Sequence, residues 1–216
     1  MQSDEVLEMV EKMWGLEFTG RQKEQLNQYV GLLYEWTTRV RLVSRKDREF
    51  IWDRHVLDCL TVVPYLPVQG RHFDLGSGAG LPGLIIKIMM PSLEVFLLEP
   101  ARMKHLFLKE AVDRLGLDGV YAIKQRSEQL VEDPEFKGRF AVGTARAVAQ
   151  LPQLWAWSEP LLKEDGILIA MKGPAPLEEW SQRDHRSVRV KEMVLPITDK
   201  QRSLVFIAKD KSEKKE

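Results

Sequence analysis

Residues 73–83 read Phe73-Asp74-Leu75-Gly76-Ser77-Gly78-Ala79-Gly80-Leu81-Pro82-Gly83, and they join a short apolar run to a longer one. Glycines allow a sharp turn and leave bare peptide groups that a ligand can approach closely. Pro82 suits the first turn of a helix. The segment therefore predicts a strand, a ligand-binding turn and a helix in direct succession.

The chain after this turn alternates short apolar runs with helical runs, which is typical of α/β proteins. We expect strands at 72–75, 94–99, 119–124, 140–146, 166–172, 186–195 and 203–209. We expect helices at 81–90, 101–115 and 150–162, and another near 176–183. The last two strands are too close in sequence for a crossover helix, so we expect an antiparallel pair at the sheet edge.

The chain before the turn has a helical pattern throughout. Thr19 and Gln22 match a capping box, and apolar residues then recur at helical spacing from Leu26 to Val40. A second helical stretch is expected at 47–66. We therefore expect a helical extension at 1–68, a main domain at 69–209 and a charged tail at 210–216.

Composition excludes several classes of protein. The chain has 216 residues and a single cysteine, Cys59, which excludes a disulfide framework and fits a reducing cytoplasm. No run approaches the ~18 apolar residues of a membrane span, and the acidic N-terminus is unlike a secretion signal. The four histidines are too scattered to predict a metal site. We expect a cytoplasmic protein. Cys59 is expected to be a small residue of the apolar core rather than a reactive thiol.

Charge is balanced overall, with 32 basic and 32 acidic residues, but it is unevenly distributed. Six basic residues lie between positions 39 and 54: Arg39, Arg41, Arg45, Lys46, Arg48 and Arg54. A local excess of this kind allows a face for an anionic partner. An ordinary solvated surface is the alternative interpretation.

Two acidic residues flank the glycine turn in a pattern that favours a nucleoside ligand. The glycines give G-x-G-x-G, without the G-x-G-x-x-G spacing of a dinucleotide site. Asp74 suits a cationic part of a ligand better than a pyrophosphate, because opposite charges attract strongly at a partly dry site. Glu99, at the end of the next strand, can accept hydrogen bonds from both ribose hydroxyls.

Two further positions are expected at the same edge of the sheet. Ser127 and Glu128 follow the third strand, where backbone groups could receive an adenine or where Ser127 could cap a helix. Arg146 ends the fourth strand, and an unpaired buried arginine is costly. Arg146 is therefore expected to line the pocket or to form a salt bridge at the sheet edge.

These motifs resemble a known family. D-x-G-S-G-x-G with an acid after the second strand resembles class I S-adenosylmethionine-dependent methyltransferases. The longer string at 73–83 resembles the glucose-inhibited division protein B (RsmG) family in particular, over about residues 30–208. Further matching pieces are Arg54-His55-Val56-Leu57-Asp58, residues 104–108, Arg126-Ser127-Glu128, Ala145-Arg146-Ala147 and Met171-Lys172-Gly173. The chain departs from the family at Arg41-Leu42-Val43-Ser44 and at Asp58-Cys59-Leu60, both on the expected RNA side.

The resemblance implies a Rossmann-like, mostly parallel seven-stranded sheet with helices on both faces, and S-adenosylmethionine as cofactor. It implies methylation of guanine N7 in 16S ribosomal RNA, as free RNA or within the small ribosomal subunit, with neither DNA nor a membrane as partner. The implied cofactor contacts are Asp74, Gly76, Ser77, Gly78, Leu81, Glu99, Ser127, Glu128 and Arg146. The expected RNA contacts are Arg41, Arg45, Lys46, Arg54, Arg126 and Lys172.

No nucleophile is assigned, because methyl transfer to an unprotonated purine nitrogen requires alignment rather than a general base. His55, Asp58 and Arg146 are candidates for orienting the base. A His55–Asp58 pair that ties the helical extension to the sheet is the alternative. Two rival functions remain at this point: a non-catalytic RNA-binding or ribosome-assembly protein that keeps the pocket, and an NAD-dependent oxidoreductase. A small-molecule methyltransferase is a third possibility, which the basic segment disfavours.

Overall fold

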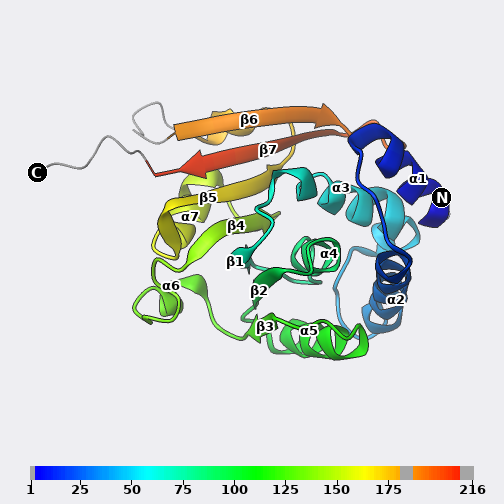
Figure 1. Cartoon of the computed structure of the whole chain (residues 1–216), viewed down its shortest axis with the longest axis horizontal. Helices are drawn as coiled ribbons and strands as arrows, with labels where there is room; N and C mark the ends of the chain where they lie inside the picture. The colour runs from blue at the N-terminus through cyan, green and yellow to red at the C-terminus, as the bar shows by residue number, and fades with distance from the viewer. Residues whose placement is uncertain (1–2, 181–186, 210–216) are drawn as a thin grey trace, which may run out of the picture.

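The computed structural model describes residues 3–180 and 187–209, and its centre is one seven-stranded sheet. The strand order is β3-β2-β1-β4-β5-β7-β6 (Figure 1). The strands are β1 (Gly70–Leu75), β2 (Leu93–Leu98), β3 (Val120–Ile123), β4 (Phe140–Arg146), β5 (Leu162–Lys172), β6 (Ser187–Val194) and β7 (Gln201–Ala208). Strands β1 to β5 pair in parallel, and β7 runs antiparallel to both β5 and β6. The prediction of a mostly parallel sheet with an antiparallel edge pair is confirmed.

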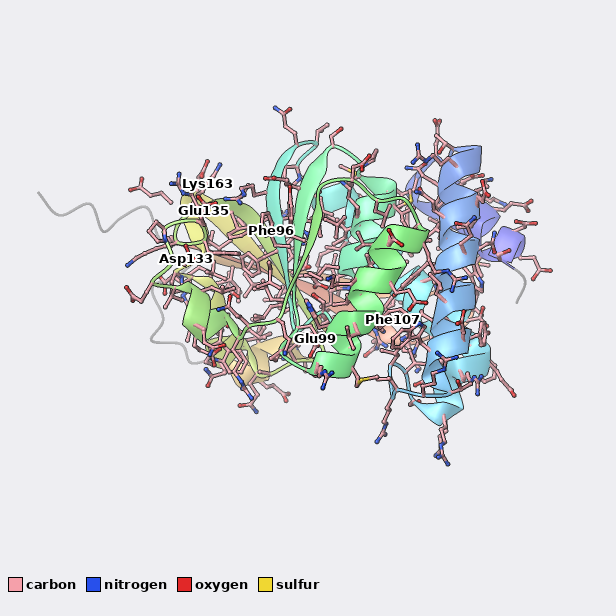
Figure 2. All side chains as sticks on the ribbon, turned by 90° about the horizontal axis from the view of Figure 1, so that it is seen from below. Phe96, Glu99, Phe107, Asp133, Glu135 and Lys163 are labelled. Atoms are coloured by element: carbon pink, nitrogen blue, oxygen red, sulfur yellow. The ribbon has the colours of Figure 1, made fainter. Side chains whose placement is uncertain are left out.

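Helices cover both faces of this sheet (Figure 1). On one face lie α2 (Gly20–Thr37), α4 (Gly83–Met89) and α5 (Arg102–Arg114), and on the other lie α6 (Ser127–Leu130) and α7 (Leu151–Ser158). Each face has its own apolar core. Figure 2 shows Phe107 of α5 on the side of α2, where its ring packs edge-on against Trp36 with centroids 5.7 Å apart. Phe96 of β2 belongs to the opposite core.

Strand alternation decides which β1 side chains meet which layer. Phe73 and Leu75 join the core beneath α7, while His72 and Asp74 point to the face covered by α4. The carboxyl ends of β1, β2, β3 and β4 meet at one edge, and the glycine turn lies there. Parallel strands thus bring positions far apart in sequence to the same ligand-binding edge.

One boundary was wrong on the α7 side of the sheet. The helix expected at 150–162 ends at Ser158, and β5 begins at Leu162 rather than at 166. Phe140 pairs with Leu162 across a register shift, and a side chain at Gly166 would meet the Phe140 carbonyl oxygen at 2.8 Å. Residues 163–165 therefore form an irregular extension of the strand. The expected helix near 176–183 is a short 3-10 helix at Pro176–Glu179, and its last expected residues, like Arg186, lie outside the described ranges.

The N-terminal extension packs into the same core as α4 and α5. It begins with α1 (Ser3–Trp14), and the predicted capping box of α2 is present, with Gln22 N donating to Thr19 Oγ1 at 3.2 Å. The stretch expected as one helix at 47–66 is instead a series of short turns. These are a 3-10 helix at Arg45–Phe50, a π-helix at Trp52–Val56, α3 (Leu57–Leu60) and a 3-10 helix at Val63–Tyr65. The tail at 210–216 lies outside the described residues.

Within the described parts of the chain, every helix is too short or too polar to cross a membrane.

Candidate active site

The turn after β1 is built from three glycines in the left-handed backbone region. Gly76, Gly78 and Gly80 have φ values of +66°, +57° and +81°. A side chain at Gly80 would lie 2.4 Å from Leu84 Cδ1, so packing against α4 also requires a glycine there. A side chain at Gly78 would meet only the Gly76 carbonyl oxygen, at 3.7 Å. The middle of the turn is thus open on one side and presents bare peptide groups.

Glu99 fixes this turn from the neighbouring strand. Its Oε2 accepts a hydrogen bond from the Gly78 amide at 2.9 Å, and its Oε1 accepts one from the Ala101 amide at 2.8 Å. Glu99 is buried, and it lies at the end of the strand next to the start of α5 (Figure 2). The Ser77 hydroxyl closes the turn by donating to the Asp74 carbonyl oxygen at 2.8 Å. Glu99 therefore contacts the turn directly, and its predicted contact with ribose hydroxyls stays a prediction.

Asp74 faces inward, beneath the turn. Its Oδ2 accepts from the Gly83 amide at 3.1 Å, and its Oδ1 accepts from the Thr144 hydroxyl at 3.0 Å. Burial raises the pKa of Asp74 to about 7, against the lowering effects of these hydrogen bonds. The carboxyl group thus braces the start of α4 from inside, and the predicted direct contact of Asp74 with a cationic ligand stays a prediction.

A second buried residue supports Asp74 through Thr144. The Thr144 hydroxyl gives its one proton to Asp74, so it must accept from His72 Nε2, 2.9 Å away. Burial lowers the pKa of His72 to about 3, which keeps the ring neutral with its proton on Nε2. The sequence pattern missed His72 and Thr144, although both occupy the same face of adjacent strands as Asp74.

A pocket of about 120 Å³ lies beside the turn. It brings together three of the predicted cofactor contacts, Gly76, Ser127 and Glu128, with the predicted RNA contact Arg126. Its remaining lining residues are mostly apolar: Leu75, Leu98, Pro100, Gln125, Val148 and Trp157. Leu75 and Leu98 are the last residues of β1 and β2, and Trp157 belongs to α7. A concave apolar floor with a few polar groups at its rim is typical of small-ligand sites.

Ser127 is the first residue of α6, and Arg126 occupies the N-cap position, so the idea that Ser127 is the cap was wrong. The backbone amide of Arg126 donates to Gln129 Oε1 at 3.0 Å, so the side chain of Gln129 bonds the start of the helix. The Ser127 hydroxyl instead donates to Glu128 Oε2 at 3.2 Å. Leu81, also predicted at the cofactor, is buried at the end of the turn.

Arg146 joins the sheet to the helical extension. Its Nε donates to Asp58 Oδ2 at 2.9 Å, and one terminal nitrogen lies 2.7 Å from His55 Nδ1. Asp58 also accepts from Arg202 Nε, through its other oxygen, at 3.1 Å. The two arginines thus hold one buried carboxylate between them. The structure brings His55, Asp58 and Arg146 together through Arg146, and the salt bridge expected as an alternative for Arg146 is present. Their role in orienting the base stays a prediction.

Arg202 was missed because it lies at the start of β7, far from any motif. The antiparallel pairing of β7 with β5 brings Ser203 beside Lys172, at the carboxyl edge of the parallel strands. An edge strand predicted to run antiparallel therefore contributes its first residues, rather than its last, to the ligand side of the sheet.

His55 is neutral in this arrangement. An arginine only donates hydrogen bonds, so His55 Nδ1 must accept and the ring proton lies on Nε2. Burial, with the positive charge of Arg146, lowers the pKa of His55 to about 4. Its buried Nε2 has no hydrogen-bond partner among the described residues.

The predicted RNA-contact residues differ in how free their side chains are. Arg41, Arg45 and Lys46 are exposed around a cavity of about 580 Å³ that residues 37–41 and 43–46 line, and Arg126 is exposed beside the smaller pocket. The other two are held by the protein. Arg54 donates to Asp47 Oδ1 at 2.6 Å, and Lys172 donates to the Ala149 carbonyl oxygen at 2.7 Å.

Cys59 is fully buried, which confirms its predicted place in the core. Burial raises the pKa of its thiol to about 12. A thiol of this kind stays protonated at neutral pH, and it is a poor nucleophile.

Together, the strand order, the glycine turn and the acid at the end of β2 define a class I methyltransferase fold. A crystal structure of a predicted O-methyltransferase from Agrobacterium tumefaciens superposes with a TM-score of 0.57 over 71% of this chain and 79% of that one, at 19% identity. The family model described as rRNA small subunit methyltransferase G (GidB) matches residues 22–205. The chain belongs to this family.

Individual relatives agree with the family model. The chain is 32% identical to "Ribosomal RNA small subunit methyltransferase G" of Lactobacillus johnsonii, over 94% of this chain and 89% of the relative. It is 44% identical to the protein of the same name from Nocardioides sp., over 64% of this chain and about half (54%) of that longer relative. The family resemblance inferred from the motifs is confirmed, and the match begins somewhat earlier than expected.

Proposed function

We propose that this protein transfers a methyl group from S-adenosylmethionine to N7 of a guanine in 16S ribosomal RNA. One observation carries the proposal: an open turn of bare peptide groups, bonded to Glu99, borders a pocket that Ser127 and Glu128 close on the other side. Family membership supports the same activity. Action on ribosomal RNA also supports the expected cytoplasmic location.

The residues at the turn fit an adenosyl ligand. Glu99 Oε2 already accepts a hydrogen bond from Gly78, and a carboxylate at this point suits ribose hydroxyls. The apolar floor at Leu75, Leu98 and Trp157 suits a flat heterocycle. When bound, S-adenosylmethionine supplies an electrophilic methyl group whose leaving group departs as a neutral thioether.

The remaining residues of the site orient the acceptor base. Guanine N7 carries a lone pair at neutral pH, so the protein needs to align the base rather than remove a proton. His55 carries its proton on Nε2, but this atom is buried and lies 4.0 Å from Asp47 Oδ2, so its donation to an acceptor such as guanine O6 would require a local rearrangement. Arg146 fixes the ring of His55, and Asp58 fixes Arg146.

The ribosomal RNA partner would lie along the exposed basic side chains. Arg41, Arg45 and Lys46 can contact phosphates, and Arg126 offers a further cation next to the pocket. Arg54 and Lys172 already have partners within the protein, so their contacts with RNA would require a change of partner.

The test uses 30S subunits and naked 16S RNA from cells that lack this gene. We expect the purified protein and S-adenosylmethionine to produce N7-methylguanine, mapped by chemical cleavage at that base. Tight cofactor binding without any transfer would favour the non-catalytic alternative. Binding of NAD with no affinity for S-adenosylmethionine would overturn the proposal.

A further inference from the structure

A side chain of the helical extension is hydrogen-bonded to the glycine turn. Tyr29 lies in the middle of α2, is completely buried, and donates its hydroxyl proton to the Ala79 carbonyl oxygen at 2.6 Å. Ala79 stands between Gly78 and Gly80, both in the left-handed region. The hydrogen bond therefore connects residues 50 positions apart, from the extension to the centre of the turn.

The turn needs anchors of this kind because it has few side chains of its own. Glu99 holds the Gly78 amide from the β2 side, and Tyr29 holds the next carbonyl from the opposite, α2 side. Glycine-rich backbone loses more conformational freedom on ordering than any other. A turn that is already fixed between two anchors binds a ligand without paying that entropy at the binding step.

Packing alone does not account for a tyrosine at position 29. A phenylalanine would fill the same apolar space, and burying a hydroxyl is unfavourable unless it is bonded. Burial also raises the pKa of Tyr29 well above its ordinary value, so the hydroxyl remains a donor at neutral pH. Among the described residues, the hydrogen bond of this hydroxyl goes to the turn, at the Ala79 carbonyl oxygen.

We propose that Tyr29 is a positioning residue for cofactor binding, which orders the glycine turn by holding the Ala79 carbonyl. The inference rests on the proposed function, since the ligand concerned is S-adenosylmethionine. It assigns to the extension a direct part in the cofactor site, which lies otherwise in the sheet and its loops.

The test compares Tyr29→Phe with Tyr34→Phe by calorimetric titration with S-adenosylmethionine. Tyr34 is on the same helix, is half-buried, and its hydroxyl has no partner among the described residues, so it is a matched control. Losing the donor to a buried carbonyl should raise the Kd of Tyr29→Phe about tenfold. We expect Tyr34→Phe to bind like the wild type. At saturating cofactor, kcat and the KM for RNA should stay within about twofold for both variants.

A second measurement tests the turn without any ligand. Hydrogen exchange of the amides at 76–81 should become faster in Tyr29→Phe and not in Tyr34→Phe, while exchange in the sheet stays unchanged. An unchanged Kd with unchanged local exchange, or a lower melting temperature alone, would overturn the inference. Wild-type protein that does not bind S-adenosylmethionine would instead overturn the proposed function, and the exchange experiment would still decide the role of Tyr29 in the turn.

Discussion

The carboxyl edge of the sheet and the basic segment at 39–46 both carry charged residues that the proposed function uses, but they hold them in opposite ways. At the edge, Asp58 is almost fully buried and is bonded by Arg146 and Arg202. In the basic segment, Arg45 and Lys46 are exposed. One region fixes each charged atom in a single position, and the other presents charge to solvent.

This difference separates two physical tasks. Alignment of a base for methyl transfer needs groups whose positions are fixed before the substrate arrives. Recognition of an RNA backbone needs positive charge that can adapt to many phosphates, and its strength depends on salt. Substitutions at the edge should therefore change stability and catalysis, whereas substitutions in the basic segment should change RNA affinity and little else.

The largest effect is expected for Asp58→Ala. The substitution leaves Arg146 mostly buried without its carboxylate, and removing one partner of a buried ion pair costs about 3 kcal/mol or more. We expect a loss of that size in the free energy of unfolding, measured by urea denaturation, together with a large loss of methyl transfer. Glu49→Ala, an exposed acid in the same part of the extension, should change stability by less than about 0.5 kcal/mol. Equal losses in the free energy of unfolding for Asp58→Ala and Glu49→Ala would contradict the proposed difference between buried and exposed charges.

Glu99→Gln should have the next largest effect, on cofactor affinity. The amide keeps the shape of the side chain but removes the charge and one of two acceptor oxygens at the turn. Hydrogen bonds to charged groups contribute about 1.5–3 kcal/mol, so we expect the Kd for S-adenosylmethionine to rise about 10- to 100-fold. Glu94→Gln, at the other end of β2, is the control. Wild-type affinity in Glu99→Gln would rule out the ribose contact.

Asp74 gives a pH dependence that can be isolated by Asp74→Asn. Burial raises the pKa of Asp74 to about 7 from 3.8, so between these values the folded chain keeps a proton that the unfolded chain loses. This contribution to stability is complete below about pH 4 and falls as the pH rises, by up to about 1.4 kcal/mol per pH unit. We expect the wild type to lose stability relative to Asp74→Asn between pH 4.5 and 6.5 in urea denaturation.

The low pKa values of His55 and His72 produce the opposite slope in part of this range. The contribution of His55 cancels in the Asp74→Asn comparison, whereas that of His72, which is linked to Asp74 through Thr144, is checked by repeating the comparison in a His72→Gln background. A difference in stability that does not vary with pH would mean that Asp74 is already ionised in the folded protein at pH 4.5.

The local motifs were enough to predict the turn, the place of Glu99 after β2, and Gly76, Ser127 and Glu128 at the pocket, because each follows the end of a strand with a clear apolar pattern. The apolar lining residues Val148 and Trp157 were not predicted. Positions that depend on pairing between distant strands were not predicted. Arg202 becomes part of the site only because β7 runs antiparallel to β5, and Thr144 only because it lies beside Asp74 in the sheet. No local signal in the sequence marks either contact.

The irregular stretch at 45–65 shows a second limit. Its apolar spacing predicts one helix, but the chain changes from 3-10 to π to α geometry within a few residues. His55 lies in the π segment and Asp58 in α3, and both point at Arg146. The bonds to Arg146 of β4 thus accompany the departure from regular helix geometry, and the apolar spacing of the sequence does not reveal them.

The smallest change in stability is expected for the double substitution Arg45→Ala and Lys46→Ala. Both side chains are exposed, so we expect a change of less than about 0.5 kcal/mol in the free energy of unfolding and unchanged binding of S-adenosylmethionine. If both contact phosphates, the slope of log K for RNA against log salt should become less steep by about 1.4, since each contact with a single strand contributes about 0.7. Filter binding to 16S RNA fragments over a range of salt concentrations measures this slope. A slope equal to that of the wild type would remove these two residues from the RNA interface.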